Sequence, residues 1–145
     1  MSRYRIMMAL AGAAAAGCAA LLAVTHAAQT RAAATAWGQA IEVPGLGALN
    51  AGGHALVSSV SCASAGSCTA GGGYTDHHGR FQAFVASQRN GRWGTAIEVP
   101  GTAALNAGGE AQVNSVSCNQ PGPCTAGGSY KHSHGPTQGF VVNWS

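Results

Sequence analysis

A tandem repeat is the feature that most constrains the fold of this chain. Aligning Trp37 with Trp93 matches two segments without a gap to the C-terminus, with 32 identities over 53 aligned pairs. The shared frame reads W-G-x-A-I-E-V-P-G-x-x-A-L-N-A-G-G, then V-x-S-V-S-C-x5-C-T-A-G-G-x-Y, then H-G-x-x-Q-x-F-V. A fixed period of 56 residues indicates a repeat architecture in which one supersecondary unit recurs. We therefore expect two copies of one unit, residues 35–92 and 93–145.

Each copy has the pattern of four short strands separated by turns. In the first copy the expected strands are residues 37–43, 55–62, 68–74 and 81–88. Asn90-Gly91, between the last of these and Trp93, is a strong two-residue hairpin signal. Short strands at regular spacing, with no helical periodicity, favour an all-β fold. The prediction is two four-stranded antiparallel repeats, preceded by an N-terminal signal helix.

Charge excludes one class of partner. Charged residues make up 8% of the chain, against roughly 25% in an average globular domain. From Thr35 onward the chain has four basic and four acidic residues, so that part carries no net charge. The basic residues are Arg80, Arg89, Arg92 and Lys131, and the acidic residues are Glu42, Asp76, Glu98 and Glu110. A protein that binds nucleic acid needs a basic patch to neutralise phosphates, and this sequence offers none.

The N-terminal segment has the composition of an export signal. Arg3 and Arg5 precede an uncharged stretch, residues 6–24, and A-x-A patterns follow at residues 32–36. A positive start, an apolar middle and a small-residue exit are typical of a secretory signal peptide. We expect residues 1–34 to be removed and the mature protein to be extracellular, either free or at the bacterial cell surface.

Two alternatives keep this segment at the membrane. The apolar stretch, residues 6–24, is 19 residues long, just enough for a membrane helix, although its Ala and Gly content makes insertion weak. Cys18 follows small residues and offers a lipoprotein anchor, but the residue three positions before it is Ala15 rather than Leu. Contact with a membrane is therefore expected only through an uncleaved segment.

The four remaining cysteines form two identical motifs, Cys62-x5-Cys68 and Cys118-x5-Cys124. An even number of cysteines in a small exported protein predicts disulfides. Because each pair flanks one expected hairpin turn, Cys62 is expected to pair with Cys68, and Cys118 with Cys124. Structural zinc is the weaker interpretation, since zinc sites favour C-x2-4-C spacing and an oxidising compartment pairs the thiols first.

The segments Ser59–Tyr74 and Ser115–Tyr130, with S-V-S-C-x5-C-T-A-G-G-x-Y, resemble a repeat of exported actinobacterial proteins. The Trp-Gly opening and the Gln-x-Phe-Val strand belong to the same pattern. The resemblance implies a β-propeller-like blade, with the Trp strand outermost, and it supplies no catalytic residues. This sequence departs from that family in having two copies. The resemblance then implies an orphan outer strand at residues 37–43 and self-association of several chains to close a ring.

Polar residues gather in the loops of one end of each expected repeat. Alternate turns of an antiparallel meander emerge at the same end, so the turn between the third and fourth strands, residues 74–80, and the long loop after Pro44 lie together. Because function tends to sit on loops held by a rigid scaffold, any ligand is expected there. The candidate ligand-binding residues are His54, Tyr74, Asp76, His77, His78, Glu110, Tyr130, His132 and His134. A metal is conceivable at the histidines, but solvated turn tips are the better interpretation, and no metal or other cofactor is predicted.

Catalysis has little support in the sequence. Asp76 is the only aspartate and no G-x-S-x-G elbow exists. Glu42 and Glu98 are repeat equivalents, expected on different blades and too far apart for acid–base work. We therefore expect a secreted, non-enzymatic binding or surface-structural protein. The alternatives are a carbohydrate-binding lectin assembled as an oligomeric propeller, which implies a glycan or cell-surface ligand, and a truncated remnant.

Overall fold

The computed structural model describes residues 36–119 and 123–144. The chain divides into residues 1–38 and a compact unit, residues 39–145. Of the first part, only residues 36–38 are described, and they have no regular secondary structure. The expected signal segment, with Cys18, lies outside the described residues. Among the residues that are described, no helix has both the length and the apolar character needed to cross a bilayer.

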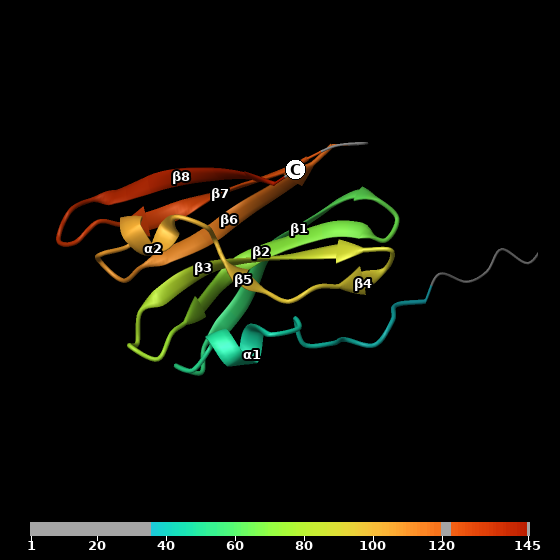
Figure 1. The fold of residues 1–145 in the computed structure, drawn as a ribbon, viewed down its shortest axis with the longest axis horizontal. Coiled ribbons are helices and arrows are strands. Elements are labelled where there is room, and N and C mark those ends of the chain that lie inside the picture. Colours follow the sequence, from blue (N-terminus) through green and yellow to red (C-terminus); the bar gives the residue numbers. More distant parts are fainter. Residues whose placement is uncertain (1–35, 120–122, 145) are drawn as a thin grey trace, which may run out of the picture. The chain divides into compact units, whose positions relative to one another are not determined.

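The compact unit is built from antiparallel sheets, which confirms the all-β prediction (Figure 1). The first sheet has the order β1 (Ala55–Ser64), β2 (Ser67–Thr75), β3 (Phe81–Arg89). Its fourth position is filled by two short strands, β4 (Arg92–Trp93) and β5 (Ile97–Glu98), which both pair with β3. The opening of the second repeat therefore completes the sheet of the first repeat.

The second sheet has three strands, in the order β6 (Ala111–Cys118), β7 (Cys124–Lys131), β8 (Thr137–Trp144). No fourth strand pairs with β8 among the described residues. The prediction of a strand at residues 37–43 is wrong, since this segment has no strand assignment in the structure. Its equivalent in the second repeat forms β4 and β5 because β3 precedes it in the chain and offers a free edge. Residues 37–43 have no preceding sheet within the described chain.

Two single-turn helices interrupt the long loops and were not predicted. They are α1 (Leu46–Leu49) and α2 (Thr102–Leu105), each preceded by a glycine with positive φ. The loops are equivalent in detail: Asn50 N–H donates to Leu46 O over 2.9 Å, and Asn106 N–H donates to Thr102 O over 2.8 Å. A four-residue helix is too short to produce a 3.6-residue hydrophobic period, so the sequence pattern could not reveal it.

The turns divide between the two ends of the sheets as expected. Gly91 N–H donates to Gly66 O over 2.9 Å, which joins the β1–β2 and β3–β4 turns at one end. At the same end, disulfides link Cys62 with Cys68 and Cys118 with Cys124. Asn90 and Gly91 have φ values of 51° and 77°, the left-handed pair that a tight hairpin turn requires. The longer loops are left to the opposite end.

Two hydrophobic clusters form the core. One lies between the sheets and centres on fully buried Ala83, Val99 and Val113. The other lies on the opposite face of the first sheet, where Tyr74 and Phe84 pack beneath α1 with other side chains. Glycines in β2 make close packing of the sheets possible: a Cβ at Gly71 would lie 2.6 Å from Val113 Cγ1.

Candidate binding site

The loop end of the molecule carries the predicted ligand-binding residues. There the β2–β3 turn meets the long loop that precedes β1: Gly52 N–H donates to Thr75 O over 2.9 Å, and Thr75 N–H donates to His54 O over 2.8 Å. The second copy repeats this contact, since Gly108 N–H donates to Lys131 O over 2.7 Å. This part of the geometric prediction is confirmed. These contacts fix the backbone positions of the predicted residues. Their side chains fall into three groups: those in a groove between the sheets, those with structural partners in a turn or in the core, and those at exposed turn tips.

A groove between the two sheets contains the first group. It has a volume of about 520 Å3, within the roughly 300–1,000 Å3 usual for small-molecule sites. The residues that line this loop-end groove are His54, Leu56, Phe81, Glu110, Ala111, Gln112, Ser129 and Thr137. Of the nine predicted ligand-binding residues, the groove brings together His54 from the first repeat and Glu110 from the second.

An aromatic ring forms one wall of the groove because a glycine lies behind it. A Cβ at Gly73 would collide with the ring atoms of Phe81, so this side chain occupies space that only glycine leaves free. His54 stands beside it, with ring centroids 5.8 Å apart and planes inclined at 32°. In the second repeat Ser129 and Thr137 occupy the positions of Gly73 and Phe81. The groove therefore has an aromatic wall from one repeat and a hydroxyl-bearing wall from the other.

Glu110 supplies the only charge in the lining of the groove. Its side chain is two-thirds exposed, and Oε2 lies 3.5 Å from Lys131 Nζ. The backbone at this position is fixed, since Phe81 N–H donates to Gly109 O over 2.8 Å across the junction of the sheets. An exposed carboxylate at this position can accept hydrogen bonds from the hydroxyl or N–H groups of a ligand.

Asp76 serves the turn rather than the groove. Its carboxylate accepts hydrogen bonds from His78 N–H, Arg80 N–H and Gln82 Nε2 over 2.8, 2.9 and 3.0 Å. Partial burial opposes ionisation, but the hydrogen bonds from Gln82, Arg80 and His78 and the charge of Arg80 outweigh it and lower the pKa of Asp76 to about 2. Gln82 in turn accepts from Asn106 Nδ2 over 2.8 Å, which ties this turn to the second repeat.

The two predicted tyrosines lie away from the groove. Tyr74 is buried beneath the first sheet, where its hydroxyl donates to Glu98 Oε2 over 3.4 Å. Burial, followed by the charge of Glu98 and this hydrogen bond, raises the pKa of Tyr74 to about 12. Tyr130 is half-buried against the cluster between the sheets. Both side chains contribute to packing, and neither lines the groove.

The turn histidines form the third group and lie at exposed positions. His77 and His78 contact each other, with ring centroids 3.7 Å apart. His132 Nδ1 lies 3.4 Å from Leu105 O, and His134 is exposed. Across the described residues, no three His, Cys, Asp or Glu side chains come together as a metal site would require.

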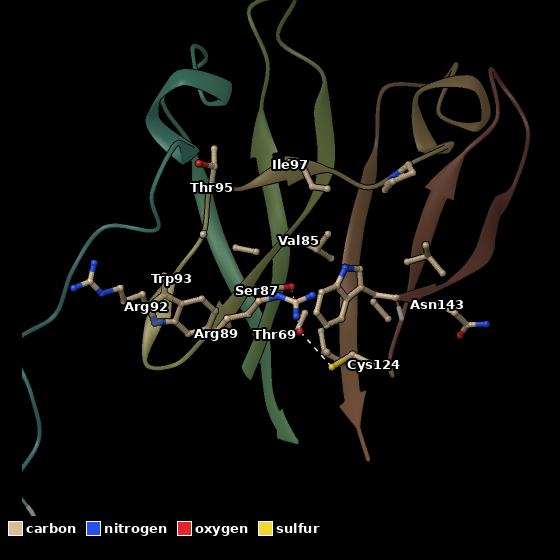
Figure 2. A pocket seen from close by; sticks show the side chains of 17 residues that line it. Thr69, Val85, Ser87, Arg89, Arg92, Trp93, Thr95, Ile97, Cys124 and Asn143 are labelled. Carbon is tan, nitrogen blue, oxygen red and sulfur yellow. Dashed lines mark hydrogen bonds between the residues drawn. The ribbon is translucent and has the colours of Figure 1, made fainter. Parts of the chain in front are cut away.

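A second cavity, of about 510 Å3, lies between β3–β5 of the first sheet and β7–β8 of the second (Figure 2). Its walls are mostly apolar. Figure 2 shows Thr69 directed at Cys124, where its hydroxyl donates to Sγ over 3.3 Å. The Arg89 guanidinium lies over the Trp144 ring, 4.4 Å from the centroid. These polar groups already serve contacts between the sheets, so the cavity offers a ligand fewer free partners than the loop-end groove does.

Sequence reasoning missed the groove residues Phe81, Gln112, Ser129 and Thr137. The signal was present in the repeat alignment, because Gly73 and Phe81 in one copy become Ser129 and Thr137 in the other. Comparison with known proteins adds no assignment: no family model, no curated protein and no solved structure matches the chain.

Proposed function

We propose that this chain is an exported, non-enzymatic binding protein whose ligand occupies the loop-end groove. The observation that carries the proposal is the lining of that groove, in which an aromatic ring faces carboxylate, amide and hydroxyl groups. Two carboxylates outside the groove have structural partners: Asp76 holds a turn, and Glu98 accepts from Tyr74. Export is supported by the two disulfides, which form and persist in oxidising compartments.

The chemistry of the groove favours a saccharide among small ligands. Sugars present an apolar C–H face and a rim of hydroxyl groups. Phe81 offers a surface for the apolar face, and the aromatic ring of His54 extends it. Glu110, Gln112 and Ser129 offer acceptors and donors for the hydroxyls. A carbohydrate-binding protein is therefore the specific form of the proposed function.

Binding to a panel of immobilised glycans, followed by calorimetry with the best soluble saccharide, tests the proposal. Phe81→Ala removes the aromatic wall, and Glu110→Gln removes the charge. Each substitution is expected to weaken binding at least about tenfold, because each removes about 1.4 kcal/mol or more of contact. His134→Ala is the matched control, since this exposed side chain lies outside the groove.

Two results would count against the proposal. Binding that is lost with His134→Ala but retained with Phe81→Ala would move the site to the turn tips. A folded protein that binds no glycan on the panel would remove the saccharide class and leave the surface-structural alternative.

A further inference from the structure

The junction between the two sheets is held by side chains at specific repeat positions. Ser59 Oγ accepts a hydrogen bond from Val116 N–H, and Ser61 Oγ accepts one from Cys118 N–H, each over 3.0 Å. These bonds join the exposed edge of β1 to the edge of β6. Behind them, a Cβ at Gly71 would lie 3.1 Å from Val116 Cγ2, so the β6 side chains pack directly on the β2 backbone.

At the loop end the same junction is held by an amide pair. Asn106 Nδ2 donates to Phe81 O over 2.9 Å and to Gln82 Oε1 over 2.8 Å. Asn106 is 1% exposed and Gln82 is 5% exposed, so this pair is sealed inside the junction. These contacts involve two serines, two valines, one glycine and one amide pair, in addition to the Thr69–Cys124 and Arg89–Trp144 contacts described above.

Each of these residues recurs 56 positions away, at a position that is exposed or half-buried. The second copies of the serines, the glycine and the glutamine are Ser115, Ser117, Gly127 and Gln138, on the second sheet. The second copies of the valines and the asparagine are Val57, Val60 and Asn50, on the first sheet or in its loop. Among the described residues none of them makes the corresponding contact within the chain.

The exposure of these residues is unusual for their type. Val57 and Val60 are 44% and 53% exposed, whereas their equivalents Val113 and Val116 are 0% and 7% exposed. On the second sheet, a Cβ at Gly127 would lie no closer than 3.8 Å to any atom outside its chain neighbours. The face of β1 that carries Val57 and Val60 and the face of β7 that carries Gly127 are therefore both left without a covering sheet within the described chain.

The second sheet also lacks the fourth strand that the first sheet has, among the described residues. Ile97 of β5 pairs with Val85 of β3, and Val99 N–H donates to Ala83 O over 2.9 Å. The string W-G-x-A-I-E-V-P-G that forms β4 and β5 occurs again at residues 37–45, where Ile41 is 67% exposed. The strand edge it would need is β8, where Val141 holds the position of Val85 and is 79% exposed.

We propose that this chain assembles head to tail with copies of itself. In the assembly the second sheet of one copy packs on the first sheet of the next, and residues 37–43 of the next copy pair with β8 as its fourth strand. Within the chain, β5 pairs with the first sheet and leads through α2 directly into β6, which packs on that sheet. One continuous segment therefore provides both the fourth strand and the packed sheet. Residues 37–43 lead through α1 into β1 in the same way, so a single neighbouring copy provides both contacts.

The contact between copies reproduces the junction within the chain with three losses. Gly139 replaces fully buried Ala83, which removes one methyl group from the cluster between the sheets. Ser145 holds the repeat position of Arg89, so the Arg89–Trp144 stacking has no counterpart between copies. Thr137 replaces Phe81, which removes one aromatic side chain. Because the contact uses different surfaces on the two partners, it closes into a ring or extends into a filament. Closed rings of about four to eight blades are usual, which at two sheets per chain corresponds to about two to four copies.

Sedimentation velocity and native mass measurement of the whole chain test the assembly. The expected result is a species of several copies, which Val141→Lys converts to monomer by placing a charge on the β8 edge. Val141 is exposed within the chain, so the melting temperature of the monomer should hold. His77→Lys places the same charge at an exposed turn tip and should leave the assembly intact. A wild-type monomer at every concentration, or an assembly that survives Val141→Lys, would overturn the proposal.

Cysteine cross-linking tests the register. The pairing of Val85 with Ile97 predicts that Val141 of one copy faces Ile41 of the next. The double variant Ile41→Cys/Val141→Cys should form disulfide-linked multimers on non-reducing gels. The control Ile41→Cys/Thr137→Cys moves the thiol four residues along β8, about 13 Å away, beyond the reach of a disulfide. Equal cross-linking in both double variants, or none in either, would refute the strand pairing.

Discussion

The two sheets share a sequence frame, yet they have different surroundings within the chain. Phe84 of the first sheet is fully buried, between the sheet and α1, whereas its equivalent Phe140 is half-buried. The first sheet has its outer edge covered by β4 and β5, whereas the outer edge of β8 is free among the described residues. The comparison teaches that the burial of a residue in this fold depends on what lies beside its sheet rather than on the residue type, because α1 covers Phe84, and β4 and β5 cover the edge of β3.

The largest expected effect comes from removing the aromatic core of one sheet. Phe84→Ala should lower the free energy of unfolding by about 3–5 kcal/mol, because a fully buried ring leaves a cavity. Phe140→Ala should cost less, because its ring already has partial access to water. Urea denaturation followed by circular dichroism measures both values. Equal losses would mean that the two sheets are equally packed.

The disulfides should rank next. Replacing both cysteines of a pair by serine opens a loop of about seven residues, which the chain-entropy relation values at about 2 kcal/mol. The Cys118–Cys124 pair should cost more than the Cys62–Cys68 pair, because Cys124 is buried between the sheets and accepts a hydrogen bond from Thr69. Thermal melts of the two double variants give the order. A greater loss for the first pair would contradict the role of the second in the junction.

The β2–β3 turn and its equivalent, the β7–β8 turn, should differ in the same direction. Asp76→Ala removes the acceptor of three hydrogen bonds and should cost about 2 kcal/mol, as expected for bonds to a charged group. His132→Ala, at the equivalent position, should change the stability by less than about 0.5 kcal/mol, because its side chain is exposed. Chemical denaturation of the two single variants measures the difference, and equal losses would remove the structural role of Asp76.

Acid should act through the same carboxylate. The pKa of Asp76 is about 2 in the folded chain, below its ordinary value of 3.8. The folded state therefore binds this proton more weakly than the unfolded state does. The stabilisation is complete above about pH 4 and is lost as the pH falls through about 2. Urea midpoints measured between pH 5 and pH 2 should fall more for the wild type than for Asp76→Ala.

Local signals in the sequence were enough for most of the strands and turns. The strands that became β1, β2 and β3 and the Asn90-Gly91 hairpin were predicted because each depends on neighbouring residues. The predicted strand at residues 37–43 was wrong because a strand needs a partner edge. Residues 93–99 differ from residues 37–43 only at Thr95 in place of Gln39, and they form strands beside β3. Sequence pattern cannot show which sheet, if any, provides that edge.

The candidate site was predicted in position but only partly in its residues. The loop end followed from the alternation of turns in a meander, and His54 and Glu110 came with it. Asp76 and Tyr74 were assigned to a ligand from their position at the loop end, because the sequence does not show that their side chains bond to Gln82 and Glu98, 6 and 24 positions away. Phe81 was missed because its exposure depends on the absence of a side chain at Gly73, on another strand.

The smallest expected effect concerns the equivalent tyrosines. Tyr74→Phe should lower the free energy of unfolding by about 0.5–1 kcal/mol, since its hydroxyl makes one long hydrogen bond, 3.4 Å, to Glu98. Tyr130→Phe should change it less, because its hydroxyl has no protein partner among the described residues.

High pH should separate the two tyrosines further. The pKa of Tyr74 is raised from 10 to about 12, so the folded state holds this proton more tightly than the unfolded state. The stabilisation is therefore complete below pH 10 and is lost as the pH rises through about 12. Denaturation midpoints measured across this window should fall more steeply for the wild type and Tyr130→Phe than for Tyr74→Phe, and parallel curves for all three proteins would show that the Tyr74 phenol ionises as freely in the fold as in the unfolded chain.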